Sequence, residues 1–113
     1  ARAAGIEPEP VLGHGAGAWL AAGAFESAAL HAALQAHGDF LGERRFSMWA
    51  DFQQRGRTEV EALNGYVVRK GAGLGVGTPA NAAIVRMVHA LEAGQPLPAA
   101  DVIAELLRCL PRP

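Results

Sequence analysis

Apolar residues recur every three or four positions through most of the chain, which is the spacing of helices that bury one face. No stretch alternates apolar and polar residues convincingly, as a half-buried strand would. A succession of helices without strands predicts an all-α helical bundle. Its longest apolar stripe consists of Val60, Leu63, Val67, Gly71 and Leu74. Glycine on that stripe would permit a neighbouring backbone to come close.

The first part of the chain is expected to contain a connection and two helices. Residues 1–13 hold two prolines and are expected to form a connection or ragged end, whereas 14–110 form the bundle. Residues 16–24 and 26–37 are alanine-rich, which favours helix. Gly38 is placed to end the second of them.

The middle of the chain contains two candidate helix starts. Ser47 stands before a short amphipathic run that Gly56 breaks. Thr58, followed three residues later by Glu61, matches a capping box, in which the two side chains bind each other's backbone N–H groups. The long helix is therefore expected to begin at Glu59.

Two further helices complete the predicted bundle. Thr78 and Pro79 have the residue types of an N-cap and first helical position, and Gly94 is placed to end that helix. Its expected buried residues are Ile84, Val85, Val88 and Leu91. The last helix is expected to end at Pro111 and to bury Val102, Ile103, Leu106 and Leu110.

Composition narrows the classes of protein. The 113 residues, 50% hydrophobic, are enough for one modest core, so 1–113 is expected to be a single helical domain. The net charge of −1, with acids and bases interspersed, argues against nucleic acid or an anionic membrane as partner. Cys109 stands alone among leucines, where a thiol usually behaves as a small buried hydrophobe. Without a leader or spanning segment in the sequence, the expected location is cytoplasmic.

Polar and glycine residues occur at fixed spacings over 47–81. They read S-M-x-x-D, G-R-x-T-E, L-N-G and G-x-x-x-P-x-N. The residues are Ser47, Met48, Asp51, Gly56, Arg57, Thr58, Glu59, Leu63, Asn64, Gly65, Gly75, Pro79 and Asn81. This pattern resembles the C-terminal domain of the ketopantoate reductases (2-dehydropantoate 2-reductases), a helical domain of the 6-phosphogluconate dehydrogenase C-terminal type.

The resemblance implies a two-domain oxidoreductase. In that family an N-terminal Rossmann domain binds NADPH, and the helical domain contacts a 2-keto acid substrate and often forms the dimer interface. A dinucleotide-binding domain takes roughly 150 residues, so this chain is expected to lack it. Since the sequence starts at Ala1, it is expected to be an excised piece that is inactive alone. NADP is expected in the full-length enzyme and not on this fragment.

Two residues are the leading site candidates. The resemblance implies that Glu59 binds the substrate hydroxyl and supports the reduction, and that Ser47 contacts the substrate. Each also has a structural alternative. Glu59 would complement the dipole of the helix it begins, and Ser47 would cap its own helix. The free N–H groups at that helix start would also suit the carboxylate of a 2-keto acid.

Asp51 and Asn64 are second-rank candidates for substrate binding. Asp51 lies one helical turn after Ser47, so the two residues share a helix face, and Asn64 lies near the apolar stripe, where an amide needs partners. The family's catalytic lysine is not found. Lys70 lies eleven residues after Glu59, about 16 Å along the helix axis, too far to act on the same carbonyl.

Two other patterns are not expected to form sites. Gly71, Gly73, Gly75 and Gly77 follow a predicted helix, whereas the dinucleotide fingerprint follows a strand; a helix end and loop is the preferred interpretation. The four histidines lack metal-site spacing, so no metal is expected. Those residues are His14, His31, His37 and His89.

A second functional class stays open on the sequence alone. Apolar helix faces left without a partner domain would favour self-association, so the chain is expected to form a homodimer. The alternative to the enzyme hypothesis is therefore a non-catalytic helical interaction module in which the site residues are idle.

Overall fold

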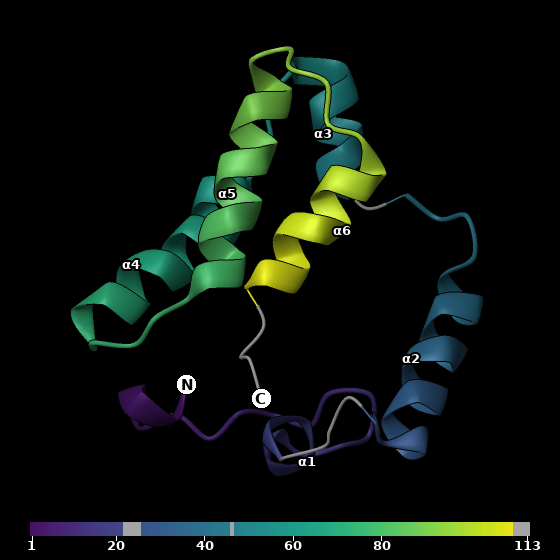
Figure 1. Cartoon of the computed structure of the whole chain (residues 1–113), viewed down its shortest axis with the longest axis vertical. Helices are drawn as coiled ribbons and strands as arrows, with labels where there is room; N and C mark the ends of the chain where they lie inside the picture. Colours follow the sequence, from purple (N-terminus) through teal and green to yellow (C-terminus); the bar gives the residue numbers. More distant parts are fainter. Residues whose placement is uncertain (22–25, 46, 110–113) are drawn as a thin grey trace. The chain divides into compact units, whose positions relative to one another are not determined.

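A computed structural model describes residues 1–21, 26–45 and 47–109. The chain divides into two compact units, Ala1–Arg44 and Arg45–Pro113, and each is described by itself. Helices dominate both units (Figure 1). The β structure in the described residues is limited to an isolated bridge between Val11 and His14. The predicted all-α class is confirmed, and no described helix is long and apolar enough to cross a membrane.

The N-terminal unit contains the short helices η1 (Arg2–Ala4) and α1 (Ala16–Leu20) and the longer α2 (Ala28–Leu41). The indole N–H of Trp19 in α1 lies 3.2 Å from the carbonyl oxygen of Val11 and 3.3 Å from that of His14, which holds the preceding turn. The prediction that the first helix extends over residues 16–24 is wrong, because α1 ends at Leu20 and Ala21 has an extended backbone; residues 22–24 lie outside the described residues. The hydroxyl of Ser27 caps α2 by accepting the N–H of Leu30.

The prediction that Gly38 ends the second helix is wrong. Helix α2 continues to Leu41 and ends at Gly42, whose positive φ of 52° suits glycine. A mid-helix glycine costs about 1 kcal/mol relative to alanine, which is not enough to stop a helix. The side chains of Gln35 and Asp39, one turn apart, are joined by a 2.9 Å hydrogen bond across this point.

The C-terminal unit contains α3 (Ser47–Arg55), η3 (Glu61–Gly65), α4 (Tyr66–Gly73), α5 (Pro79–Glu92) and α6 (Ala99–Arg108). Helices η3 and α4 are continuous, and both pack on α5. Helices α5 and α6 contact each other as a hairpin (Figure 1). The core centres on the side chains of Val60 and Ala83, which are 1% and 0% exposed.

The predicted apolar stripe of the long helix is wrong beyond its first residue, except at Gly71. Leu63 is 55% exposed and Val67 is 41% exposed, whereas Asn64 and Val68 are half-buried. The reason is η3, which is a π-helical turn. A π turn is wider than an α-helical turn, so the residues that follow it directly face a different side than in a regular α-helix.

The role expected of Gly71 is confirmed. It is buried, and a Cβ there would lie 2.6 Å from the carbonyl oxygen of Val76. The glycines after it form the predicted helix end and loop, since α4 ends at Gly73 and Gly75 has a positive φ of 66°. The chain therefore turns back tightly enough for α5 to pack against α4.

The starts and ends of the last two helices largely follow the sequence prediction. Pro79 is the first residue of α5, which ends just before a glycine turn at Gly94. The hydroxyl of Thr78 makes no cap bond, in contrast to the expectation for that position. In α6, Ile103 is exposed although it was predicted to be buried. Helix α6 ends at Arg108, before the predicted end at Pro111, and the prediction for Leu110 lies outside the described residues.

Candidate functional site

Glu59 stands at the start of the long helix. Its carbonyl oxygen accepts the N–H groups of Ala62 and Leu63, at 3.0 and 3.1 Å, and so belongs to the first helical turn. Its side chain is exposed and makes no hydrogen bond or ion pair with another described residue. The carboxylate is therefore available to a ligand.

The residue before it is held by a carboxylate from another helix. The backbone N–H and the hydroxyl of Thr58 both donate to Oε1 of Glu92, at 2.6 and 2.7 Å. The same hydroxyl oxygen accepts the N–H of Val60 at 3.2 Å. Glu92 is the last residue of α5, 34 positions along the chain. The start of the long helix is thus attached to the end of α5.

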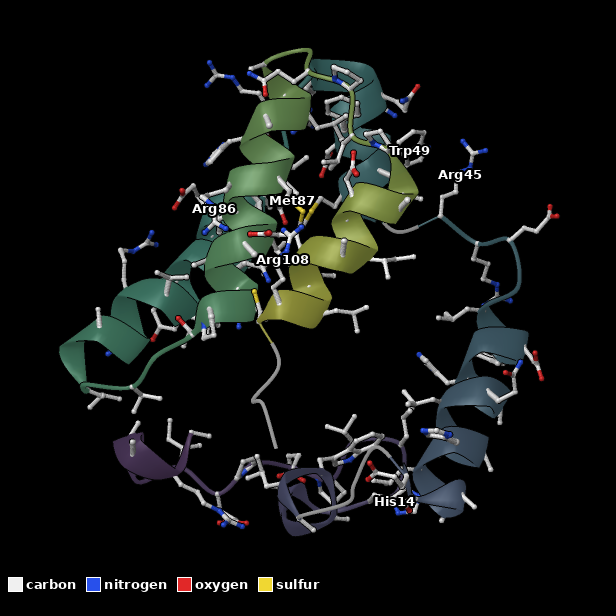
Figure 2. The ribbon with its side chains drawn as sticks, in the orientation of Figure 1. His14, Arg45, Trp49, Arg86, Met87 and Arg108 are labelled. Atoms are coloured by element: carbon white, nitrogen blue, oxygen red, sulfur yellow. The ribbon has the colours of Figure 1, made fainter. Side chains whose placement is uncertain are left out.

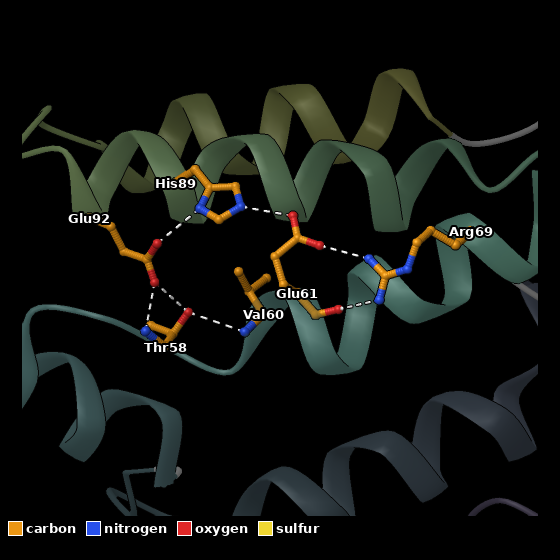
Figure 3. A network of polar contacts seen from close by, with 6 residues as sticks. All are labelled: Thr58, Val60, Glu61, Arg69, His89 and Glu92. Atoms are coloured by element: carbon orange, nitrogen blue, oxygen red, sulfur yellow. Dashed lines mark hydrogen bonds and ion pairs between the residues drawn. The ribbon is translucent and has the colours of Figure 1, made fainter.

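The predicted capping box is therefore wrong. Glu92 occupies the place on the Thr58 N–H that Glu61 was expected to take. The side chain of Glu61 instead points to His89 and Arg69 (Figure 3). The physical reason is that the π turn and the packing on α5 bring a stronger, charged set of partners within reach of Glu61 than a single backbone N–H.

A continuous polar chain results. The second oxygen of Glu92 lies 2.9 Å from Nδ1 of His89, whose Nε2 lies 2.9 Å from Oε1 of Glu61. Arg69 donates to Oε2 of Glu61 at 2.9 Å and to its carbonyl oxygen at 3.2 Å. Thr58, Glu92, His89, Glu61 and Arg69 thus form one network, called here the α5 network (Figure 3).

The geometry of the α5 network favours a charged imidazole. Each ring nitrogen of His89 faces a carboxylate oxygen, and only the doubly protonated ring donates from both nitrogens. Hydrogen bonds to the carboxylates of Glu61 and Glu92 accordingly raise the pKa of His89 above its ordinary value. Bonds from His89 and Arg69 lower the pKa of Glu61. Bonds from Thr58 and then from His89 lower the pKa of Glu92.

Two asparagines of the motif meet. The amide nitrogen of Asn64 in η3 donates to the amide oxygen of Asn81 in α5 at 3.0 Å, and both residues are half-buried. The expectation that Asn64 needs a partner is met by this bond. The pair ties the π turn to the first turn of α5.

The other two candidates, Ser47 and Asp51, lie on helix α3. Helix α3 begins at Ser47 itself and not after it, and the hydroxyl is exposed. Asp51 lies on the same helix and approaches Arg55 at 4.0 Å. Among the described residues, no hydrogen bond or ion pair joins Ser47, Asp51 and Glu59 to one another.

Two other reactive groups, those of Lys70 and Cys109, make contacts outside the α5 network. The Lys70 ammonium lies over the ring of Tyr66, 5.9 Å from its centre. The thiol of Cys109 is half-buried and donates to the carbonyl of Glu105 at 3.3 Å, as a small core residue would. Within the described ranges, no three His, Cys, Asp or Glu side chains are grouped to hold a metal ion. Figure 2 shows the side chains in both units.

Sequence reasoning missed His89 and Glu92. They lie three residues apart on one face of α5, which brings both toward the start of the long helix. That spacing was the available signal, but it does not reveal which distant residues the pair will meet.

Comparisons with known proteins point to one family. The family model described as ketopantoate reductase PanE/ApbA C terminal matches residues 11–92. A 2-dehydropantoate 2-reductase of Archaeoglobus fulgidus is 36% identical over 56 residues, which cover 50% of this chain and 19% of that protein. The match thus spans about a fifth of the length of that relative. No solved structure matched the chain.

Proposed function

Because this chain belongs to the ketopantoate reductase family, through the C-terminal region of that family, we propose that it is the substrate-binding part of an NADPH-dependent 2-keto acid reductase. Glu59 binds the substrate hydroxyl in this proposal. The cofactor, which supplies a hydride when bound, is held by a Rossmann domain and not by the glycine loop after α4. That loop follows a helix, so it has no strand from which a phosphate-binding turn could extend.

The observation that carries the proposal is the state of the Glu59 carboxylate. The residues on either side of it are fixed, since Thr58 binds Glu92 and Glu61 binds His89 and Arg69. Glu59 alone in this segment has an exposed carboxylate without a partner among the described residues. A carboxyl group on a fixed backbone is a good acceptor for a hydroxyl, because little ordering is needed when the ligand binds.

Ser47 completes the proposed substrate contacts. It is the first residue of α3, where free backbone N–H groups and the positive end of the helix dipole favour an anion. The carboxylate of a 2-keto acid is such an anion. Asp51 and Asn64 have supporting roles, since each already has a protein partner.

The test is the Glu59→Gln variant of the full-length protein that contains this chain, assayed for NADPH-dependent reduction of 2-dehydropantoate. Glutamine keeps the shape but weakens a charge-assisted hydrogen bond, so kcat/KM should fall roughly ten- to hundredfold, or about 1.5 to 3 kcal/mol. Equal losses in Glu59→Gln and a matched control, parallel to a lower melting temperature, would assign Glu59 to the stability of the helix.

Glu105→Gln is the matched control. Glu105 is a half-buried carboxylate of α6 that pairs with Arg86 and Arg108, both at 2.6 Å, and it does not contact the Glu59 segment. Its replacement should lower stability and leave kcat/KM within about twofold. Glu61→Gln is unsuitable as a control because Glu61 belongs to the α5 network.

A second candidate function is helix-mediated dimerisation. It is favoured by the exposed apolar side chains on η3 and α4, which are Leu63, Tyr66 and Val67. Light scattering of the 113-residue chain over a range of concentrations should give a dimer mass. A monomer mass at high concentration would rule out this function and would leave the enzyme proposal unaffected.

A further inference from the structure

We propose that Glu92 is a positioning residue for the reaction: by holding Thr58 it fixes the backbone that presents Glu59 to the substrate. This inference rests on the proposed function of Glu59. It adds a residue from another helix, 34 positions away from the motif, to the residues on which the reaction depends.

One carboxylate oxygen of Glu92 binds two donors of Thr58. Oε1 of Glu92 accepts both the N–H and the hydroxyl of Thr58, at 2.6 and 2.7 Å. Two donors from one residue fix its backbone and its side-chain rotamer together. The hydroxyl then accepts the N–H of Val60, so the residues before and after Glu59 are both held.

These bonds also hold the first turn of the long helix. A helix begins with N–H groups that have no partner within the helix, and its first turn frays unless they are bound. In this chain the Thr58 N–H is bound by a tertiary carboxylate and the Val60 N–H by the Thr58 hydroxyl. The direction of the Glu59 side chain therefore depends on where α5 places Glu92.

Glu92 is itself held in place by His89. Its other oxygen contacts His89 one turn earlier on α5, and its side chain is only 16% exposed, against 54% for Glu61. His89 in turn contacts Glu61, two residues after Glu59. The segment 58–61 is thus tied to α5 at both ends, and Glu59 is the acid between the two ties.

Kinetics of full-length variants with 2-dehydropantoate test the inference. Glu92→Gln should lower kcat/KM roughly tenfold, because a neutral amide oxygen is a weaker acceptor for two donors. Thr58→Val, which removes the hydroxyl but keeps the N–H, should give a smaller loss. Thr58→Ser keeps both donors and should retain activity within about twofold, as rescue by the conservative residue requires.

The double variant Glu59→Gln/Glu92→Gln separates a positioning role from a structural one. If Glu92 acts through Glu59, the double variant should be no slower than Glu59→Gln alone. Losses that multiply, or a Glu92→Gln variant as active as wild type beside a slow Glu59→Gln variant, would overturn the inference and leave the proposed function intact. A Glu59→Gln variant with wild-type activity would overturn both. Glu105→Gln again controls for lost stability.

Discussion

The side-chain hydrogen bonds of the two units span different distances along the sequence. In Ala1–Arg44, the described bonds join residues at most eight positions apart, as between Trp19 and Val11. In Arg45–Pro113, such bonds span 34 positions from Thr58 to Glu92 and 28 from Glu61 to His89. The N-terminal unit is therefore stabilised by local contacts, whereas the C-terminal unit depends on contacts between helices.

The two units also differ in their part in the proposed function. Every candidate site residue lies in the unit whose polar contacts are non-local. Non-local contacts form only when the whole unit is folded, so they place side chains accurately at the cost of dependence on distant residues. Substitutions in the two units should consequently have different, and in one case opposite, effects.

The largest expected effect is at glycine. Gly71→Ala places a Cβ 2.6 Å from the backbone oxygen of Val76, which has to shift, so we expect a loss of about 2 to 3 kcal/mol of unfolding free energy. Gly38→Ala in α2 meets no atom within 4 Å and should stabilise by about 0.5 to 1 kcal/mol. Chemical denaturation of both variants measures the difference. Changes of the same sign in the unfolding free energy of both variants would contradict this difference between the two units.

A smaller effect tests the π turn. Val60→Ala removes two methyl groups from a side chain that is 1% exposed, and should cost about 1 to 2 kcal/mol. Val67→Ala, on the 41% exposed face that a regular helix would have buried, should cost less than about 0.5 kcal/mol. Equal costs at the two valines would mean that the helix keeps the regular α-helical phase.

The smallest effect concerns pH, because two of the three titrating side chains, His89 and Glu61, are exposed. The pKa of His89 is raised, so its contribution to stability is present below the ordinary value of 6.5 and is lost as pH rises through the raised pKa. The pKa values of Glu61 and Glu92 are lowered, so their contributions are present above 4.5 and are lost as pH falls through the lowered values. The α5 network should therefore stabilise most between pH 4.5 and 6.5.

Melting temperature measured against pH tests this. The wild-type chain should lose stability above pH 6.5, and His89→Gln should flatten that part of the curve. His31, on α2 in the other unit, makes no described side-chain hydrogen bond, so His31→Gln should leave the curve unchanged. An unchanged slope in His89→Gln would show that the α5 network contributes nothing through His89.

Local patterns predicted the helical class and several helix starts and ends, because glycine and proline act through their own backbone conformation, as at Pro79 and Gly94. They did not predict the π turn after Val60, whose residues pack on the distant helix α5. They also failed at Gly38, where continued helix outweighed the cost of one glycine.

The candidate site was predictable only in part. The roles predicted for Glu59 and Ser47 come from the resemblance to the ketopantoate reductases, and Asp51 and Asn64 were added from their positions along the predicted helices. Glu92 and His89 have meaning only through partners 34 and 28 positions away, and no local pattern encodes such a pairing. The same limit explains the mistaken capping box, because Glu61 at the expected spacing was drawn to α5 instead.

The most direct measurement is a crystal structure of the full-length protein with 2-dehydropantoate bound. The account predicts that the Glu59 carboxylate lies about 2.6 to 3.2 Å from the substrate hydroxyl, with Thr58 still bonded to Glu92. A substrate bound elsewhere, with the Glu59 carboxylate in solvent, would contradict it.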